Sequence, residues 1–350
     1  MANLGVAIVG YGLAGRVFHV PLIAATPGLE VATVVTGSPV RAAQAQRDHP
    51  GVRMLARAEE LWSGKPPGLV VVATPNEVHA SLAAEAIDRG VPVVVDKPLA
   101  VSAAEAEALI ARAQSAGVLL SVFHNRRWDS DQLTLRRMMA EDALGEVVRY
   151  ESRFERWRPE PAGDSWREST APEVGGGQLL DLGPHLIDQA LVLFGPVTHV
   201  YAEIEARRGL PSDDDAFLAL RHAQGTISHL HASSVTPSPG PRLRVQGTRA
   251  AFLVNGLDSQ EEALRAGGRP DITPDWGKAR EWERGRLVAG EQSVPVPSEP
   301  GAWQRFYALL EEALRSGGPP PVDPLDALAG LRVIEAARQS ANTRSLVALT

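Results

Sequence analysis

The 350-residue chain is longer than one hydrophobic core usually serves, so its length predicts two domains. Its formal charge of −7, with no block of Lys or Arg, disfavours nucleic acid and anionic membrane surfaces as partners. The absence of cysteine excludes disulfides, thiolate metal ligands and thiol catalysis. No window approaches the roughly 18 uninterrupted apolar residues of a membrane span. An apolar strand pattern already begins at Leu4, which leaves no room for a secretion signal, so we expect a cytoplasmic protein.

The first third of the chain alternates short apolar runs with helical patterns. Strands are predicted over residues 5–9, 31–35, 69–73, 91–95 and 118–122, and helices over residues 16–25, 41–47, 80–89 and 103–116. Strands and helices that alternate at this spacing are typical of an α/β fold with a Rossmann-type doubly wound parallel sheet. We assign this dinucleotide-binding domain to residues 1–123.

The pattern changes in the remainder, residues 124–350, which we predict to be a second α/β domain. Polar residues 258–300 suggest a long excursion, because they are rich in Gly and Pro. Alternating apolar and polar side chains predict a large, mainly antiparallel open sheet, and we expect the C-terminal helix to pack back on the first domain. The predicted strands span residues 148–155, 199–207, 216–221, 226–233, 242–246, 250–255 and 346–349, and the predicted helices span residues 303–314 and 325–339.

A glycine-rich turn follows the first predicted strand and opens the next helix. Gly10, Gly12 and Gly15 occupy this turn. In such a context the first glycine permits a tight turn, the second lets the backbone approach a pyrophosphate, and the third allows close contact between helix and strand. We therefore predict that the turn, with Leu13 and Ala14, binds a dinucleotide; the alternative is a glycine-rich turn without a ligand.

The end of the second predicted strand bears on the choice between NAD and NADP. An acidic residue about 20 residues after the glycine turn typically binds the ribose hydroxyls of NAD. This chain has no acid there, but Thr36, Ser38 and Arg41. Two hydroxyls and a guanidinium could hold a 2′-phosphate, which a carboxylate would repel. We predict that NADP is favoured over NAD; the alternative is that Ser38 caps a helix and Arg41 is merely solvated.

The third cofactor segment follows the strand predicted over residues 69–73. It consists of Thr74, Pro75 and Asn76, with His79 one helical turn later. The carboxyl ends of parallel strands form the edge at which open α/β sheets bind ligands, so we place these residues at the cofactor, with Asn76 bonded to a ribose. For His79 the alternative is a first-turn helix residue that touches no ligand.

Lys97 is one of only three lysines in a chain whose other basic residues are arginines. It lies between Asp96 and Pro98 at the end of a predicted strand, again at the ligand edge. Unlike arginine, lysine can release its proton when buried, and it could orient a hydroxyl and tune a neighbouring base. Proline forces Lys97 out of helical geometry, and a cis bond before Pro98 is an option. The alternative is a surface pair of Lys97 with Asp96.

Asp181 and His185 follow a run of three glycines and lie four residues apart in a helical pattern. That spacing places them on one helix face, one turn from each other. A carboxylate can orient an imidazole, and histidine titrates near neutrality, as a general base for an alcohol must. Pro184 would kink this helix or lie near its first turn. The alternatives are an ordinary i, i+4 pair and a metal pair, although no third ligand lies at a suggestive spacing.

Taken in order, these motifs resemble those of the Gfo/Idh/MocA family, which includes glucose–fructose oxidoreductase and inositol dehydrogenase. The resemblance spans nearly the whole chain. It is carried by Gly10, Gly12 and Gly15; by Thr74, Pro75, Asn76 and His79; by Lys97 and Pro98; by Gly175, Gly176 and Gly177 through Asp181 to His185; and by Phe18, His19, Pro21, Asn125, Arg126, Arg127, Trp128, Trp166 and Arg167.

The resemblance implies a catalytic set and a substrate side. The catalytic set would be Lys97, Asp181 and His185, with His185 as the acid/base and Lys97 also touching the cofactor. The residues implied to line the substrate side, besides His185, are Asn125, Arg127, Trp166 and Arg167.

The resemblance also bears on charge, cofactor and assembly. Asp96 stands where the family commonly has glutamate, so the negative charge is kept on a side chain that is one methylene shorter. The strand end at Thr36 and Ser38 is similar to that of members that use NADP. The open sheet of the second domain often forms a dimer face in this family, which implies a homodimer or a dimer of dimers.

We therefore expect an NAD(P)-dependent oxidoreductase that acts on a secondary hydroxyl or carbonyl of a sugar, inositol or related polyol, without a metal. One alternative is a cofactor-sensing regulator on the same fold, which would not need an intact Lys97, Asp181 and His185. A second is an imine, enone or bilin-type reductase, and a third is a structural protein that keeps only the fold. The substrate itself is not predicted.

Overall fold

The computed structural model describes residues 3–162 and 165–349. The first domain is built on a six-stranded parallel sheet with the strand order β3-β2-β1-β4-β5-β6. This order confirms the predicted doubly wound sheet. Its strands are β1 (Leu4–Val9), β2 (Leu29–Val35), β3 (Arg53–Leu55), β4 (Leu69–Val72), β5 (Val93–Val95) and β6 (Leu120–Val122).

The predicted helices of this domain are present, with one difference at the glycine turn. The helix expected over residues 16–25 is a π-helical segment, η1, followed by the short helix α1. Strand β3 was not predicted, because three residues at a sheet edge, one of them an exposed arginine, lack an apolar run. The helical segments are η1 (Ala14–His19), α1 (Val20–Ala24), α2 (Pro39–Asp48), η2 (Ala58–Trp62), η3 (Asn76–Val78), α3 (His79–Asp88) and α4 (Ala103–Ala116).

The second domain is built on a nine-stranded sheet with the order β14-β13-β12-β11-β7-β10-β9-β8-β15. All neighbouring strands are antiparallel except β7 and β10, so the sheet is mixed and mostly antiparallel, as predicted. Its strands are β7 (Val147–Glu155), β8 (Val197–Glu205), β9 (Asp215–His222), β10 (Ile227–Ser233), β11 (Leu243–Gly247), β12 (Ala251–Val254), β13 (Arg286–Ala289), β14 (Gln292–Pro295) and β15 (Val347–Ala348).

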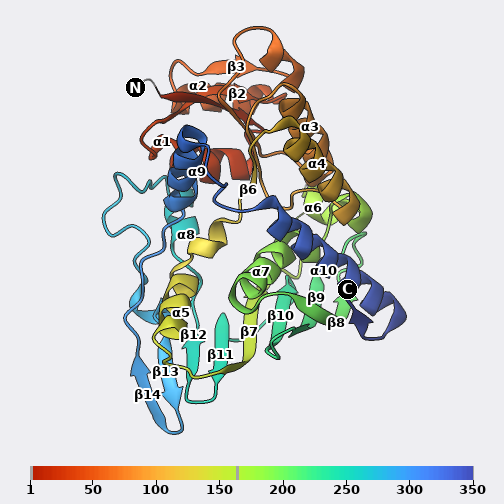
Figure 1. The fold of residues 1–350 in the computed structure, drawn as a ribbon, viewed down its shortest axis with the longest axis vertical. Coiled ribbons are helices and arrows are strands. Elements are labelled where there is room, and N and C mark those ends of the chain that lie inside the picture. The colour runs from red at the N-terminus through yellow and green to blue at the C-terminus, as the bar shows by residue number, and fades with distance from the viewer. Residues whose placement is uncertain (1–2, 163–164, 350) are drawn as a thin grey trace.

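Helices cover one face of this sheet and leave the other open. Helix α7 packs on β7, β9 and β10, and α10 packs on β8 (Figure 1). Along β9 the residues facing these helices are buried, whereas Phe217 and its neighbours on the other face are only half-buried. The helical segments of the domain are η4 (Asn125–Trp128), α5 (Ser130–Ala140), α6 (Trp166–Ser169), η5 (Pro172–Val174), α7 (Gln178–Phe194), α8 (Gln260–Arg265), η6 (Glu281–Glu283), α9 (Gln304–Ser316) and α10 (Pro324–Thr343).

The expected excursion over residues 258–300 is more ordered than its composition suggests. It contains helix α8 and a hairpin of β13 and β14 that extends the large sheet. Composition hides this hairpin because all four residues of β14 are exposed and half of them are polar. None of the helices within the described ranges combines the length and the apolarity needed to span a bilayer.

The last two long helices return to the first domain. In Figure 1 the blue helix α9 lies beside α1, and α10 runs from α4 to the large sheet. The backbone N–H of Ala103, at the start of α4, donates to Glu335 of α10 at 2.7 Å. Ser121 on β6 donates to the carbonyl of Val322 at 2.9 Å. The C-terminal segment therefore contributes to the packing of both domains.

Candidate active site

The glycine turn forms one end of a long cleft. Gly10 has φ +101°, and a side chain there would collide with the carbonyl of Ala73; a side chain at Gly15 would collide with the carbonyl of Gly10. Gly12 faces open space, with only a guanidinium nitrogen of Arg41 3.9 Å from the position a Cβ would take. Two glycines are thus required by packing, and the third leaves room for a ligand against the backbone. The turn fits a pyrophosphate, with Leu13 and Ala14 also lining the cleft.

The residues predicted to recognise a 2′-phosphate separate into two groups. Thr36 and Arg41 line the cleft. The Ser38 hydroxyl instead accepts a hydrogen bond from the backbone N–H of Arg41 at 3.4 Å and caps α2. Ser38 is not among the residues that line the cleft, so its alternative role as a helix cap holds.

The segment after β4 also lies in the cleft, but not all of its side chains face the ligand space. Thr74, Pro75 and Asn76 line the cleft, and the Asn76 amide donates to the carbonyl of Gly175 at 2.8 Å. This bond ties the cleft to the glycine run that precedes α7. His79 does not line the cleft: its ring is fully buried and lies 2.7 Å from the Pro98 carbonyl and 3.0 Å from the Thr74 carbonyl, which agrees with its alternative role as a helix residue that touches no ligand.

His79 therefore supports the two loops that carry cofactor and catalytic candidates. Its ring nitrogens join the loop after β4 to the loop after β5, where the peptide bond between Lys97 and Pro98 is cis. Burial lowers the pKa of His79 below its ordinary value, although both carbonyl contacts act in the opposite direction. Its early position in a helix carries no sign of this bridging role.

A second pocket adjoins the cleft and brings together Lys97, Asp181 and His185. The Lys97 ammonium lies 2.8 Å from Oδ1 of Asp181 and 2.5 Å from its backbone carbonyl. Arg167 donates to the same Oδ1 at 3.1 Å. Burial alone raises the pKa of Asp181, but Lys97 and Arg167 outweigh it and hold that pKa far below its usual range. Asp181 is therefore a carboxylate shared by two cations.

The predicted pairing of Asp181 with His185 is not observed. Asp181 turns to Lys97 and Arg167, and Nδ1 of His185 is buried without a hydrogen-bond partner among the described residues. The His185 ring packs near Phe154, with 6.3 Å between centroids. Burial, reinforced by nearby cations, lowers the pKa of His185 well below its ordinary value. The imidazole is thus neutral at neutral pH, which is the state that accepts a proton.

The residues implied for the substrate side are only partly in place. Asn125 and Arg167 line the pocket, whereas Trp166 lines the cofactor cleft. Arg127 is not among the residues that line the pocket, and its guanidinium bonds Asp188 at 2.5 Å and Asp326 at 2.8 Å, so its implied role on the substrate side stays a prediction. Because η4 is a tight turn, adjacent side chains leave it in different directions.

Several other residues of the pocket were not predicted. Arg126 takes the place expected for its neighbour and donates to Glu261 at 2.7 Å. Glu261 also pairs with Arg265 at 2.9 Å, so α8 from the polar excursion forms part of the wall. Their i, i+4 spacing was the one available signal, but it is common on solvated helices. The remaining polar or aromatic side chains of the pocket that were not predicted as site residues are Phe18, Asp96, Phe123, Arg156, Arg158, Ser165 and Trp303.

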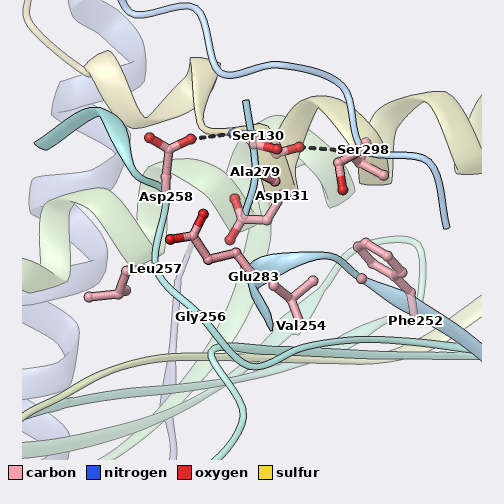
Figure 2. A pocket seen from close by; sticks show the side chains of 12 residues that line it. Ser130, Asp131, Phe252, Val254, Gly256, Leu257, Asp258, Ala279, Glu283 and Ser298 are labelled. Atoms are coloured by element: carbon pink, nitrogen blue, oxygen red, sulfur yellow. Dashed lines mark hydrogen bonds between the residues drawn. The ribbon is translucent and has the colours of Figure 1, made fainter. Parts of the chain in front are cut away.

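A smaller cavity beside α5 shares no lining residue with either space. Figure 2 shows Asp131, Asp258 and Glu283 gathered around it. Asp258 accepts hydrogen bonds from the backbone N–H groups of Ser130 at 2.7 Å and Gln260 at 2.9 Å, and burial raises its pKa to about 6. Within the described ranges, no group of three or more carboxylate or histidine side chains is placed to hold a metal. We interpret the cavity as part of the attachment of the excursion to α5.

The cofactor cleft and the catalytic pocket have a common wall. A turn of this shape at the start of a parallel sheet binds a dinucleotide, and the neighbouring pocket holds groups able to move a proton. The fold and the site therefore define the class of NAD(P)-binding oxidoreductases. The residues that line both spaces are Leu13, Ala14, Asp96, Ser165 and Arg167.

Comparison with known proteins identifies the family. Residues 4–124 match the oxidoreductase family described as an NAD-binding Rossmann fold, and residues 132–253 match the GFO/IDH/MocA C-terminal domain. The chain belongs to the GFO/IDH/MocA oxidoreductases, as its motifs suggested.

Its relatives extend over the full length. The chain is 39% identical to the oxidoreductase YdgJ of Escherichia coli K12, with 99% of each chain covered. It is 34% identical to IolW of Bacillus subtilis 168, named scyllo-inositol 2-dehydrogenase (NADP(+)), with 99% of this chain and 96% of IolW covered. The solved structure of the B. subtilis oxidoreductase yvaA superimposes with a TM-score of 0.93 at 34% identity, covering 100% of this chain and 99% of yvaA.

Proposed function

We propose that the protein is an NADP-dependent oxidoreductase that interconverts a secondary alcohol and a carbonyl on a sugar, inositol or related polyol. The observation that carries this proposal is the Lys97–Asp181 ion pair of 2.8 Å, which lies beside a neutral His185 in a pocket that shares its wall with the dinucleotide cleft. The names of two relatives agree with it: IolW, and the D-xylose 1-dehydrogenase (NADP(+)) 2 of Haloferax volcanii, which is 27% identical.

In this proposal the bound nicotinamide supplies the hydride acceptor for alcohol oxidation and the hydride donor for the reverse reaction. Lys97 has three N–H donors, of which two are directed to Asp181, so one is left to hold the substrate oxygen. His185 takes the hydroxyl proton as the hydride leaves the carbon, and it returns the proton when a carbonyl is reduced. Asp181 fixes the position of Lys97 rather than that of the histidine.

The proposal is tested by following NADPH absorbance with a panel of inositols, inososes, aldoses and ketoses. We expect turnover of at least one polyhydroxylated substrate, seen either as reduction of NADP⁺ or as oxidation of NADPH. Absence of turnover with the whole panel, in a sample that binds NADPH, would contradict the assigned substrate class.

The preference for NADP rests on Thr36 and Arg41 at the cleft, with no carboxylate nearby in the strand end. Arg41→Ala is expected to weaken NADPH binding about tenfold or more, because a charge-assisted bond to the 2′-phosphate is lost, and to leave NADH binding nearly unchanged. Calorimetric titration of the cofactor-free protein with each nucleotide measures both effects.

Arg47→Ala is the matched control, since Arg47 is an exposed arginine in the last turn of the same helix. It should leave both affinities unchanged. Equal losses for NADPH and NADH in Arg41→Ala would remove the argument for NADP while leaving the oxidoreductase proposal in place.

We also propose that the open face of the large sheet joins two copies of the chain. Phe217, His229 and His231 form an aromatic cluster there, with ring centroids 4.9 to 5.7 Å apart. A half-apolar sheet face of this kind is typical of an interface. Sedimentation at micromolar concentration should show a dimer or tetramer, and Phe217→Glu should shift it toward monomer. Ile272→Glu, which changes an exposed apolar residue outside the sheet, is the control and should leave the oligomeric state unchanged. A monomeric wild-type protein would refute the proposed interface.

A further inference from the structure

We infer that Tyr307, His19 and Asp96 form a buried relay that holds a negative charge at the nicotinamide position and so favours binding of the oxidised cofactor over the reduced one. This inference rests on the proposed function and adds an electrostatic role to it. None of the three residues belongs to the predicted catalytic set.

The position of Asp96 is the first argument. Only five described residues line both the cofactor cleft and the catalytic pocket, and Asp96 is the one acid among them. A ring that exchanges a hydride with a substrate in the pocket has to lie at this junction. The Asp96 side chain retains 12% of its exposure, whereas that of His19 retains none. The carboxylate therefore emerges where the ring would be, with the imidazole behind it.

The hydrogen-bond geometry is the second argument. The Tyr307 hydroxyl lies 2.6 Å from Nδ1 of His19, with both groups buried. Burial, assisted by the charge of Asp96, raises the pKa of Tyr307 well above its ordinary value, so the phenol keeps its proton. Because an Nε2 lone pair would be repelled by the Asp96 carboxylate that it faces, the tautomer that fits has Nδ1 accepting from the Tyr307 hydroxyl. The imidazole hydrogen is then on Nε2, which lies 3.8 Å from Oδ1 of Asp96 and has no hydrogen-bond partner among the described residues. Nε2–H is thus left to face the carboxylate.

Packing fixes this arrangement. The His19 ring lies 4.3 Å from Phe123, and the Tyr307 ring lies 5.8 Å from Phe123 and 5.2 Å from Phe306. His19 lies in η1, Asp96 in the loop after β5 and Tyr307 in α9, so the relay joins the helix that opens at the glycine turn to α9. A buried aromatic cage leaves the imidazole little freedom to turn away from Asp96.

The charge of Asp96 is the third argument. Burial acts to raise its pKa, but His19 and Lys97 more than offset this, and the pKa lies below its usual range. The carboxylate is therefore ionised at neutral pH. The Lys97 ammonium and Arg167 are already engaged by Asp181. The oxidised nicotinamide ring carries a positive charge and the reduced ring is neutral, so a fixed carboxylate discriminates between them while the phosphates common to both forms cancel.

The test is Asp96→Asn, which removes the charge at nearly constant shape. Dissociation constants for NADP⁺ and NADPH are measured by calorimetry on the same cofactor-free preparation. We expect the ratio of the NADP⁺ constant to the NADPH constant to rise about tenfold, with NADPH affinity changed less than threefold. This readout needs no substrate and no turnover.

Variants of the other two residues test the relay. Tyr307→Phe deletes one hydroxyl and should raise the same ratio by a smaller factor, about two- to fourfold. His19→Gln can place a donor near the former Nε2 and should keep the ratio nearer that of the wild type than His19→Asn, whose shorter amide falls short of Asp96. A purely structural role for the residues would weaken both nucleotides in parallel and leave the ratio unchanged.

An unchanged ratio in Asp96→Asn overturns the inference. If Asp96→Asn does not fold, as judged by thermal unfolding, Asp96→Glu and Tyr307→Phe provide the test. An unchanged ratio in Asp96→Glu together with a raised ratio in Tyr307→Phe supports the inference. Any other pair of results overturns the inference. Failure of the wild type to bind either nucleotide is a different result, because it contradicts the proposed function itself.

Discussion

Lys97→Met should lower turnover by ~10²-fold or more while NADPH affinity stays within a few-fold of the wild-type value. The methionine side chain fills a similar volume but has no N–H group, so nothing replaces the donor that holds the substrate oxygen. Asp181 keeps Arg167 as a partner at 3.1 Å, so the carboxylate is not left as an unpaired buried charge and the fold should survive. Steady-state kinetics and calorimetric titration of one preparation measure both quantities.

Lys278→Met is the control for this variant, because Lys278 is exposed and its ion-pair partner, Asp275, also lies on the surface. It should leave turnover and NADPH binding unchanged. Near-normal turnover in Lys97→Met would show that the ion pair with Asp181 is structural and that the substrate oxygen is held by another group.

His185→Ala should cost ~10²–10⁴-fold in turnover, since the proton acceptor is removed while the cofactor cleft is untouched. The His185 pKa lies well below 6.5, so alcohol oxidation by the wild type should be independent of this group at neutral pH and should fall only at pH values well below 6.5, where the imidazole becomes protonated. Carbonyl reduction requires the protonated form, so its rate should rise as the pH falls. Initial rates in both directions across the pH range measure this contrast.

The matched histidine control is His199→Ala, on β8 of the large sheet, which should keep both rates and both pH profiles. If His185→Ala retains near-normal turnover, or keeps the acidic limb of the oxidation profile, the base has been misassigned. If Lys97→Met and His185→Ala are both near normal, the whole site has been misassigned.

The fold was predictable because its main signals are local. Buried parallel strands such as β4 and β5 consist of valine and leucine only. The tight turn from β1 into the next helix leaves no room for a side chain at Gly10 or Gly15, so both glycines mark the turn in the sequence. Exposed elements were missed for the converse reason: β3 and β14 bury little, so their sequences carry no apolar pattern.

The sequence predicts which residues gather at the catalytic pocket better than it predicts which of them bond to one another. The spacing of Asp181 and His185 places both on one helix face. That Asp181 pairs with Lys97 and Arg167 instead depends on residues that lie 84 and 14 positions away in the chain. Local spacing likewise does not distinguish Arg126 from Arg127, because the direction of each side chain is set by its acidic partner on another element.

His79 is a second case in which long-range contacts, and not local sequence, set the role of a side chain. Its sequence neighbours are shared with the cofactor segment, but its ring is turned inward by two backbone carbonyls, one of them beyond the next strand. Glu261, the acidic partner of Arg126, lies in the polar excursion, where its i, i+4 spacing to Arg265 is a signal shared with solvated helices. Long-range partners of this kind decide function without leaving a local pattern.

The return of α9 and α10 to the first domain limits how this protein can be divided. Phe306 and Tyr307 pack against Phe123 at the nominal domain boundary, and Glu335 caps the start of α4. A fragment that ends near residue 123 would lack these contacts, and a chimaera that exchanged only residues 1–123 with a relative would pair foreign surfaces at each of them. The unit of recombination is therefore discontinuous: the nucleotide-binding domain has to travel with α9 and α10, and an exchange of the residues between them has to keep the contacts of Asn76 with Gly175 and of Lys97 with Asp181.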